Sequence, residues 1–158
     1  MRSDVRERLA GLGLRLPEVS PPKGAYVPAV RSGGHVFVAG QIPLTGGELT
    51  ATGRVGAEVT AERAKELSRQ CALAALAAAD SVAPLEEVVR VVKVVGYVSS
   101  APGFVRQAAV VDGASELLLE VFGEAGRHAR SVVGMDILPL DAPVEIEIVL
   151  EVVEDAAR

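Results

Sequence analysis

Several residue types are scarce in this chain of 158 residues, and each scarcity excludes a class of function. The sequence has one cysteine and two histidines, which stand too far apart for a metal-binding cluster. Cys71 has no second cysteine to pair with, which is typical of a reducing compartment. Aromatic residues make up only 3% and tryptophan is absent, so platforms for stacking bases or planar cofactors are scarce.

Charge and hydropathy indicate which partners, cofactors and cellular location to expect. The net charge is −5 and no basic stripe is present, so no nucleic-acid partner is expected. No apolar run approaches the roughly 20 residues that span a bilayer, so no membrane partner is expected. The first residues are charged and lack the apolar core of a signal peptide, which favours a cytoplasmic location. No phosphate-binding glycine motif is present, and neither a metal nor an organic cofactor is expected.

The chain is long and apolar enough to bury a core, since 49% of its residues are hydrophobic. We predict a single domain over residues 1–158. Residues 1–23 are predicted to form a short helix, 4–10, followed by an extended, proline-containing arm that crosses the surface. Residues 24–153 are predicted to form the core.

Two long helices and several strands are predicted in this core. Thr60 is the expected N-cap of a helix over 60–79. Cys71 lies on the apolar stripe of this helix, where a buried packing role is favoured over a reactive thiol. Gly113 is expected to weaken a second helix, 104–122, by about 1 kcal/mol relative to alanine. Strands are predicted at 26–30 and 35–39, joined by a tight turn, and at 88–98.

The clearest strand signal lies near the C-terminal end. Apolar residues and glutamates alternate over 144–153, which is the period of a half-buried strand. The preceding apolar segment, 131–137, is separated from it by a short stretch with two prolines. We therefore predict an antiparallel hairpin with arms at 131–137 and 144–153 and a turn over 138–143.

These elements predict an α+β fold with two main helices on one face of a mixed sheet. The strand at 88–98 is apolar on both faces, and such strands are normally covered on both sides. The two helices cover only one face of the sheet. We therefore expect a second copy of the chain to cover the other face, in a homo-oligomer.

Two charged residues near strand ends are the candidates for chemistry. Arg130 carries a guanidinium suited to a carboxylate, and Glu145 a carboxylate suited to orienting or deprotonating a water. The alternatives are a structural ion pair for Arg130 and a solvated strand carboxylate for Glu145. The predicted hairpin places Glu145 opposite a residue near Asp136, roughly 20 Å from Arg130 at 3.3 Å per residue. If the two residues share a site, they are expected to come from different subunits.

Four segments of the sequence resemble a known family. They are Tyr26-Val27, the run VAGQIP at 38–43, Ala129-Arg130-Ser131, and Leu138-Pro139 followed by VEIE at 144–147. They resemble the Rid family of reactive intermediate (enamine/imine) deaminases, which are also called YjgF-like and were once named L-PSP endoribonucleases. The resemblance covers residues 20–153, and the segments CALAALAA, VVGYVSSAPGF and GASELLLEVFGEAGRHARS look like a longer bacterial branch.

The resemblance implies a chorismate-mutase-like fold, a homotrimer with active sites between subunits, and no cofactor. It implies that Arg130 holds the carboxylate of a small substrate and that Glu145 positions the attacking water. Tyr26 and the backbone at Gly40 would line the pocket. The implied reaction is hydrolysis of 2-aminoacrylate and related 2-imino acids to 2-keto acids and ammonia.

Three positions depart from the family's pattern. Ala39 replaces the usual serine before the glycine, Val132 replaces a frequent cysteine, and His128 replaces a proline beside the arginine. All three would lie in or near the pocket, so they alter its lining while keeping the arginine and the glutamate. The alternative function is a protein of the same fold that binds small metabolites such as 2-keto acids without turnover.

Overall fold

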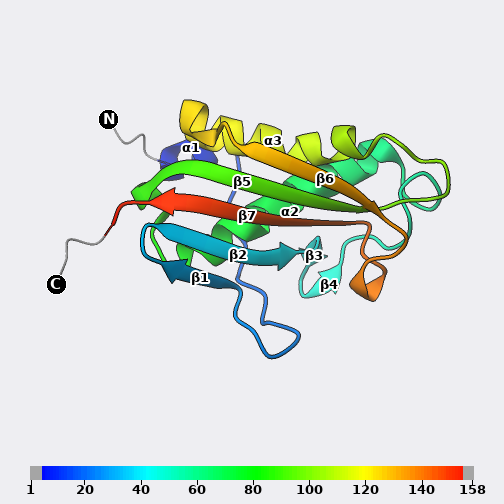
Figure 1. The fold of residues 1–158 in the computed structure, drawn as a ribbon, viewed down its shortest axis with the longest axis horizontal. Coiled ribbons are helices and arrows are strands. Elements are labelled where there is room, and N and C mark those ends of the chain that lie inside the picture. Colours follow the sequence, from blue (N-terminus) through cyan, green and yellow to red (C-terminus); the bar gives the residue numbers. More distant parts are fainter. Residues whose placement is uncertain (1–4, 155–158) are drawn as a thin grey trace.

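The computed structural model of the chain describes residues 5–154, which form a five-stranded sheet with two long helices against one face (Figure 1). This architecture is the α+β fold with a mixed sheet that the sequence predicts. The strand order is β1-β2-β7-β5-β6. The elements are α1 (Val5–Gly11), β1 (Ala29–Ser32), β2 (His35–Gln41), β3 (Leu44–Thr45), β4 (Glu48–Leu49), α2 (Ala61–Asp80), β5 (Val88–Ser99), α3 (Gln107–Phe122), β6 (Ala129–Met135) and β7 (Val144–Val152).

The predicted C-terminal hairpin is wrong. β6 and β7 both form, but β5 lies between them and pairs with each: β6 is parallel to β5 and β7 is antiparallel to it. The connection from β5 to β6 runs through α3, and a helical crossover of this length is what a parallel pair requires. Glu145 therefore pairs with Tyr97 on β5, and the predicted pairing near Asp136 does not occur.

The first hairpin is confirmed, although its first strand starts later than predicted. β1 begins at Ala29, after Pro28, whose missing N–H is unsuited to a ladder. Tyr26 therefore lies in the loop before the strand. The turn follows Ser32, and Gly33 adopts the positive φ of 55° that such a turn needs.

The two predicted long helices are confirmed, although α3 begins at Gln107 and not at residue 104, and they approach each other closely. Thr60 caps α2, because its side-chain oxygen accepts a hydrogen bond from the backbone N–H of Arg63 at 3.1 Å. Gly113 of α3 lies against the backbone of Lys65, where a Cβ would overlap the carbonyl oxygen. The glycine expected to weaken α3 therefore permits the contact between the helices.

The sheet has one face against the helices and one face away from them (Figure 1). On β7 every second side chain is buried in the core; these are Val144, Ile146, Ile148, Leu150 and Val152. The glutamates between them point to the other face, which also carries Tyr97 of β5. Among residues 5–154, no helix combines the length and the apolarity needed to cross a membrane.

Candidate active site

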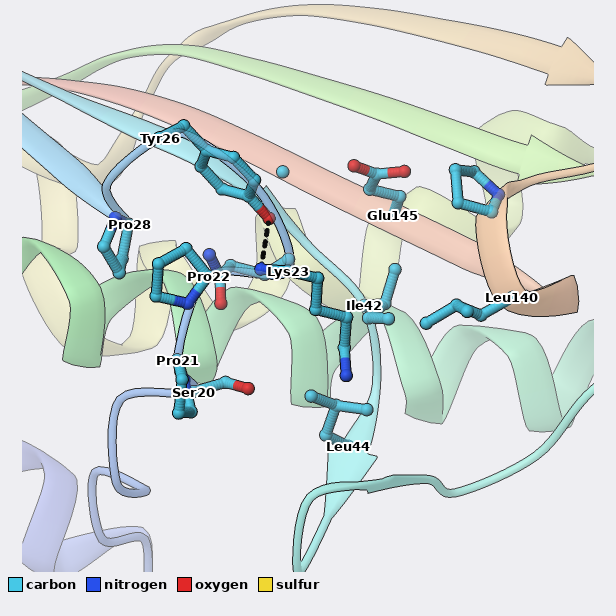
Figure 2. Close-up of a pocket in the computed structure, with 13 residues that line it drawn as sticks. Ser20, Pro21, Pro22, Lys23, Tyr26, Pro28, Ile42, Leu44, Leu140 and Glu145 are labelled. Carbon is cyan, nitrogen blue, oxygen red and sulfur yellow. Dashed lines mark hydrogen bonds between the residues drawn. The ribbon is translucent and has the colours of Figure 1, made fainter.

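A cavity of about 360 Å³ opens beside the start of β7. Three segments that are distant in the sequence form it: the arm at 20–28, the end of β2 with the residues that follow at 40–44, and the turn at 139–140 (Figure 2). Tyr26, Gly40 and Glu145, all predicted site residues, line this cavity. The structure thus places three of the seven predicted residues at one pocket.

The carboxylate of Glu145 lies against the backbone of Gly40. A Cβ on Gly40 would overlap the Oε1 atom of Glu145, so glycine is required here by close approach. The pairing of β2 with β7 is interrupted between Val38 and Gln41, and this bulge contains Gly40. Bulges of this kind redirect side chains next to functional sites.

The environment of Glu145 makes its carboxylate more basic than usual. Burial raises its pKa, and the nearby Glu147 carboxylate raises it further. Glu147 itself accepts a 2.6 Å hydrogen bond from the Tyr97 hydroxyl, which raises the pKa of Tyr97 to about 12. A half-buried carboxylate with a raised pKa is suited to taking a proton from water near neutral pH.

Among the pocket residues that the sequence did not single out, two have notable features. Lys23 brings an ammonium group to the wall made by the arm, and its backbone N–H donates to the Tyr26 hydroxyl at 3.4 Å (Figure 2). Leu140 adopts a left-handed conformation with φ of 61°, which is rare for a non-glycine residue. The sequence predicted only that this arm is extended, from prolines such as Pro21 and Pro22, and that it crosses the surface. Nothing in it predicted that Lys23 lines a pocket.

Arg130 lies away from this pocket, at the edge strand β6. Its Nη1 atom donates to Asp112 Oδ1 at 2.8 Å and to Ser115 Oγ at 3.2 Å, both on α3. Arg130 is in register with Val94 and, across β5, with Ile148, whose side chains are buried on the helix side of the sheet.

Glu145 is in register with Tyr97 on the other side of the sheet. Successive side chains of a strand point to opposite faces, and Val94 and Tyr97 are three residues apart. Arg130 and Glu145 therefore lie on opposite faces of the sheet, and one chain does not bring them together.

Of the three remaining predicted residues, Ala39 lies beside the pocket, and His128 and Val132 lie near Arg130. Ala39 lies next to Gly40 in the bulge, with its N–H bonded to the Pro28 carbonyl at 2.8 Å. His128 and Val132 lie on either side of Arg130. Val132 is partly buried against the core, whereas His128 contacts Ser115 through Nε2 at 2.9 Å. Burial lowers the pKa of His128, and the charge of Arg130 lowers it as well, against the raising effect of a hydrogen bond to Gly126.

Cys71 and the acidic residues do not form a further site. Cys71 is fully buried, with its Sγ 3.9 Å from the Val144 carbonyl oxygen, which confirms a packing role. Burial raises the pKa of its thiol well above the ordinary value. Between Val5 and Glu154, no group of three or more His, Cys, Asp or Glu side chains is arranged to hold a metal ion.

Known proteins share this fold and much of this sequence. The model of a family described as "YjgF/chorismate_mutase-like, putative endoribonuclease" matches residues 6–152. Protein TCP17 of Trypanosoma cruzi is 40% identical over 149 residues, which is 93% of each chain. The crystal structure of Atu1372 from Agrobacterium tumefaciens, whose function is unknown, superposes with a TM-score of 0.87 and 40% identity over 94% of this chain and 92% of that one. A protein from Shewanella oneidensis named a "putative endoribonuclease" superposes with a TM-score of 0.92 and 30% identity, over 95% and 100% of the two chains.

Proposed function

Because the chain belongs to the YjgF/chorismate mutase-like family, we propose that it hydrolyses reactive enamines and imines to 2-keto acids and ammonia. The substrates would be 2-aminoacrylate, in its imine form, and related 2-imino acids. The observation that carries this proposal is the Glu145 carboxylate, which has a raised pKa and lies over Gly40 in a pocket. Imines react readily with water, so an enzyme needs only to orient the substrate and one water molecule.

In the proposed reaction Glu145 acts as the general base. It accepts a proton from water as the water oxygen bonds to the imine carbon, and it returns that proton to the nitrogen, so that the carbon carries one hydroxyl and one amine group. The carbon–nitrogen bond then breaks, the hydroxyl proton passes to the nitrogen, and ammonia leaves a 2-keto acid. Arg130 would hold the substrate carboxylate through paired hydrogen bonds, which fixes the imine carbon relative to the water.

The proposed site requires more than one copy of the chain. Arg130 and Glu145 lie on opposite faces of one sheet, so a site that uses both must take them from different subunits. We propose a homotrimer in which the face carrying Glu145 packs against a neighbouring copy. Val95 and Tyr97 are only partly buried on that face within one chain, which supports the proposal. A stable monomer at micromolar concentration in sedimentation velocity would contradict it.

A second candidate function is binding of 2-keto acids without turnover. Ala39 supplies no hydroxyl to the pocket, and the Arg130 guanidinium already binds the Asp112 carboxylate. A protein with these features would retain a carboxylate site while lacking part of the catalytic lining. Pyruvate binding without any acceleration of imine hydrolysis would favour this function.

The test is release of ammonia and keto acid from 2-imino acids generated in the assay by an amino-acid oxidase. The wild-type protein should accelerate hydrolysis over buffer, whereas Glu145→Gln and Arg130→Ala should each lose roughly 100-fold or more in kcat/KM. Ser81→Ala is a suitable control, because Ser81 only caps the end of α2. Equal rates for wild type and Arg130→Ala, or RNA cleavage in place of imine hydrolysis, would contradict the proposal.

A further inference from the structure

A chain of hydrogen bonds leads from a backbone carbonyl to the Arg130 guanidinium. The Gly126 carbonyl oxygen lies 2.7 Å from His128 Nδ1, and His128 Nε2 lies 2.9 Å from Ser115 Oγ. Ser115 Oγ accepts from Arg130 Nη1 at 3.2 Å, and the same Nη1 donates to Asp112 at 2.8 Å. These hydrogen bonds therefore connect four side chains: Asp112 and Ser115 of α3, Arg130 of β6, and His128 in the loop just before β6.

The partners determine the direction of each hydrogen bond. A carbonyl oxygen only accepts, so Nδ1 of His128 carries the proton. In the neutral imidazole Nε2 is then a bare acceptor, and Ser115 must donate its hydroxyl proton to it. The oxygen lone pairs of Ser115 are left for the Arg130 guanidinium, which has only donors. With His128 neutral, the donor and the acceptor of each of these hydrogen bonds are therefore determined.

The local backbone fixes both ends of this series of hydrogen bonds, at Gly126 and on α3. Gly126 packs directly on the end of α3, where a Cβ would overlap the Leu118 carbonyl oxygen, so its own carbonyl is held in place. Asp112 and Ser115 are three residues apart and therefore lie on one face of α3. That face is the one turned to β6, because both side chains contact Arg130.

These hydrogen bonds use only one of the three guanidinium nitrogens of Arg130. Within residues 5–154, Nη1 makes both hydrogen bonds of Arg130, and Nε and Nη2 make none. A guanidinium offers five N–H donors in a planar fork, so a second carboxylate can still be bound in a bidentate manner. Asp112 and a substrate carboxylate would then be bound by different donors.

We propose that Asp112, Ser115 and His128 are positioning residues that hold Arg130 by Nη1 and leave Nε and Nη2 for the substrate carboxylate. This inference rests on the proposed function of Arg130 as the carboxylate-binding residue. It gives His128 a role different from the direct substrate contact that its sequence position suggested. It also gives the ion pair between Arg130 and Asp112 an orienting role in place of a blocking one.

Protonation of His128 would disturb this arrangement. Nε2 would become a donor, so two donors would converge on Ser115 Oγ, and a second cation would stand beside Arg130. Arg130 is the charged group whose field acts on His128. The other charged groups on adjoining elements have partners of their own. On α3, Asp112 is paired with Arg130, Glu116 with Lys65 and Glu120 with Arg69. On β5, Arg90 donates to the Arg127 carbonyl and Lys93 to Ser131, and in the preceding turn Arg127 is paired with Glu124.

The first experiment needs no substrate. Nitrogen NMR of the imidazole groups should show His128 as the Nδ1–H tautomer at pH 7.5, and His35→Gln assigns the signal because the chain has only two histidines. Ser115→Ala removes a donor to neutral His128, so the pKa of His128 should rise. A proton on Nε2, or an unchanged titration in Ser115→Ala, would overturn the proposal.

The second experiment measures substrate binding. Ser115→Ala should raise KM for the imino acid by roughly 5-fold, the effect of one lost hydrogen bond, with kcat nearly unchanged. His128→Gln retains an acceptor for Ser115 and cannot titrate. At pH 8 the KM of His128→Gln should equal that of the wild type. As the pH falls below 6.5, the KM of the wild type should rise and that of His128→Gln should stay constant. Superimposable KM profiles for wild type and His128→Gln would overturn the proposal.

The outcomes separate this inference from the proposed function. If the wild type does not hydrolyse imines, the proposed reaction fails, and the dissociation constant of pyruvate replaces KM as the measurement. The same dependence on Ser115 and on pH is then expected. An affinity for pyruvate that does not change in Ser115→Ala, or no affinity in the wild type, would overturn the positioning role itself.

Discussion

The carboxylate of Glu145 occupies the space that a side chain at Gly40 would need. A Cβ built on Gly40 overlaps the Oε1 atom of Glu145 and lies 2.8 Å from its Cδ. The φ of Gly40 is not positive, so the requirement comes from this approach and not from backbone conformation. The position of the proposed base therefore depends on the absence of a side chain on the neighbouring strand.

Gly40→Ala is expected to displace the Glu145 carboxylate with little effect on folding, because the clash involves the end of a flexible side chain. A displacement of about 1 Å lowers rates by roughly 100-fold. We expect a loss of that order in kcat/KM for imine hydrolysis, with the melting temperature nearly unchanged. Gly11→Ala is the control, since a Cβ there meets no atom within 4 Å. A fully active Gly40→Ala would show that Glu145 does not work from this position.

The raised pKa of Glu145 predicts two opposite dependences on pH. If the ionised carboxylate is the base, kcat/KM should fall as the pH drops through this pKa, which lies above the ordinary value of 4.5. Folding stability has the other sign. The folded state disfavours the ionised form, so the contribution of Glu145 to stability is present below pH 4.5 and is lost as the pH rises through the raised pKa.

Glu145→Gln separates the two effects. It should unfold at a higher temperature than the wild type at pH 7, with the difference shrinking toward pH 4, while losing the acid limb of activity and most of the rate. Calorimetry and the ammonia assay measure the two outcomes on the same preparations. A variant that is less stable than wild type at pH 7 would show that the Glu145 carboxylate makes a favourable contact when ionised.

The elements of the fold were largely predictable, but the pairing of its C-terminal strands was not. The alternation over 144–152 identifies β7 because side chains on a half-buried strand follow a period of two. The neighbour of β7 is decided by contacts over the whole chain. β5 takes the central position, and the α3 crossover places β6 on its far side.

The candidate site was predictable only in part for the same reason. Gly40 and Glu145 stand in segments whose residues match a family pattern, so the sequence alone indicated them. Lys23 and Leu140 join the pocket because three distant segments converge, and no local pattern reports such convergence. Ser115 lies within a helix where nothing in the sequence points to His128, although their side chains are 2.9 Å apart.

The thiol of Cys71 is expected to be unreactive in the folded protein. It is fully buried between α2 and the sheet, and burial raises its pKa well above 9.0, so thiolate is scarce. A disulfide reagent such as Ellman's should modify less than a tenth of the native protein under conditions that modify all of it in urea. Stoichiometric labelling of the native state would contradict this.

The raised pKa of Cys71 also has a consequence for stability. The neutral thiol is favoured by folding, so its contribution is present below pH 9.0 and is lost as the pH rises toward the raised value. The free energy of unfolding should therefore fall more steeply above pH 9 for the wild type than for Cys71→Ala. Urea titrations at pH 7, 9 and 10 measure the difference, and parallel curves for the two proteins would contradict it.

Glycine is expected to be the more stable residue at position 113 of α3, where the helix contacts α2, and alanine the more stable residue at an exposed position of the same helix. Gly113→Ala should destabilise the protein, because the new Cβ meets the Lys65 carbonyl oxygen, which belongs to the backbone and cannot rotate away. Overpacking of this kind costs about 1–3 kcal/mol, which exceeds the roughly 1 kcal/mol that alanine contributes to a helix. At exposed Ala109, in the first turn of α3, only helix propensity acts, so Ala109→Gly should cost at most about 1 kcal/mol. Urea unfolding of both variants measures these changes, and a Gly113→Ala protein more stable than wild type would show that the two backbones are not in contact there.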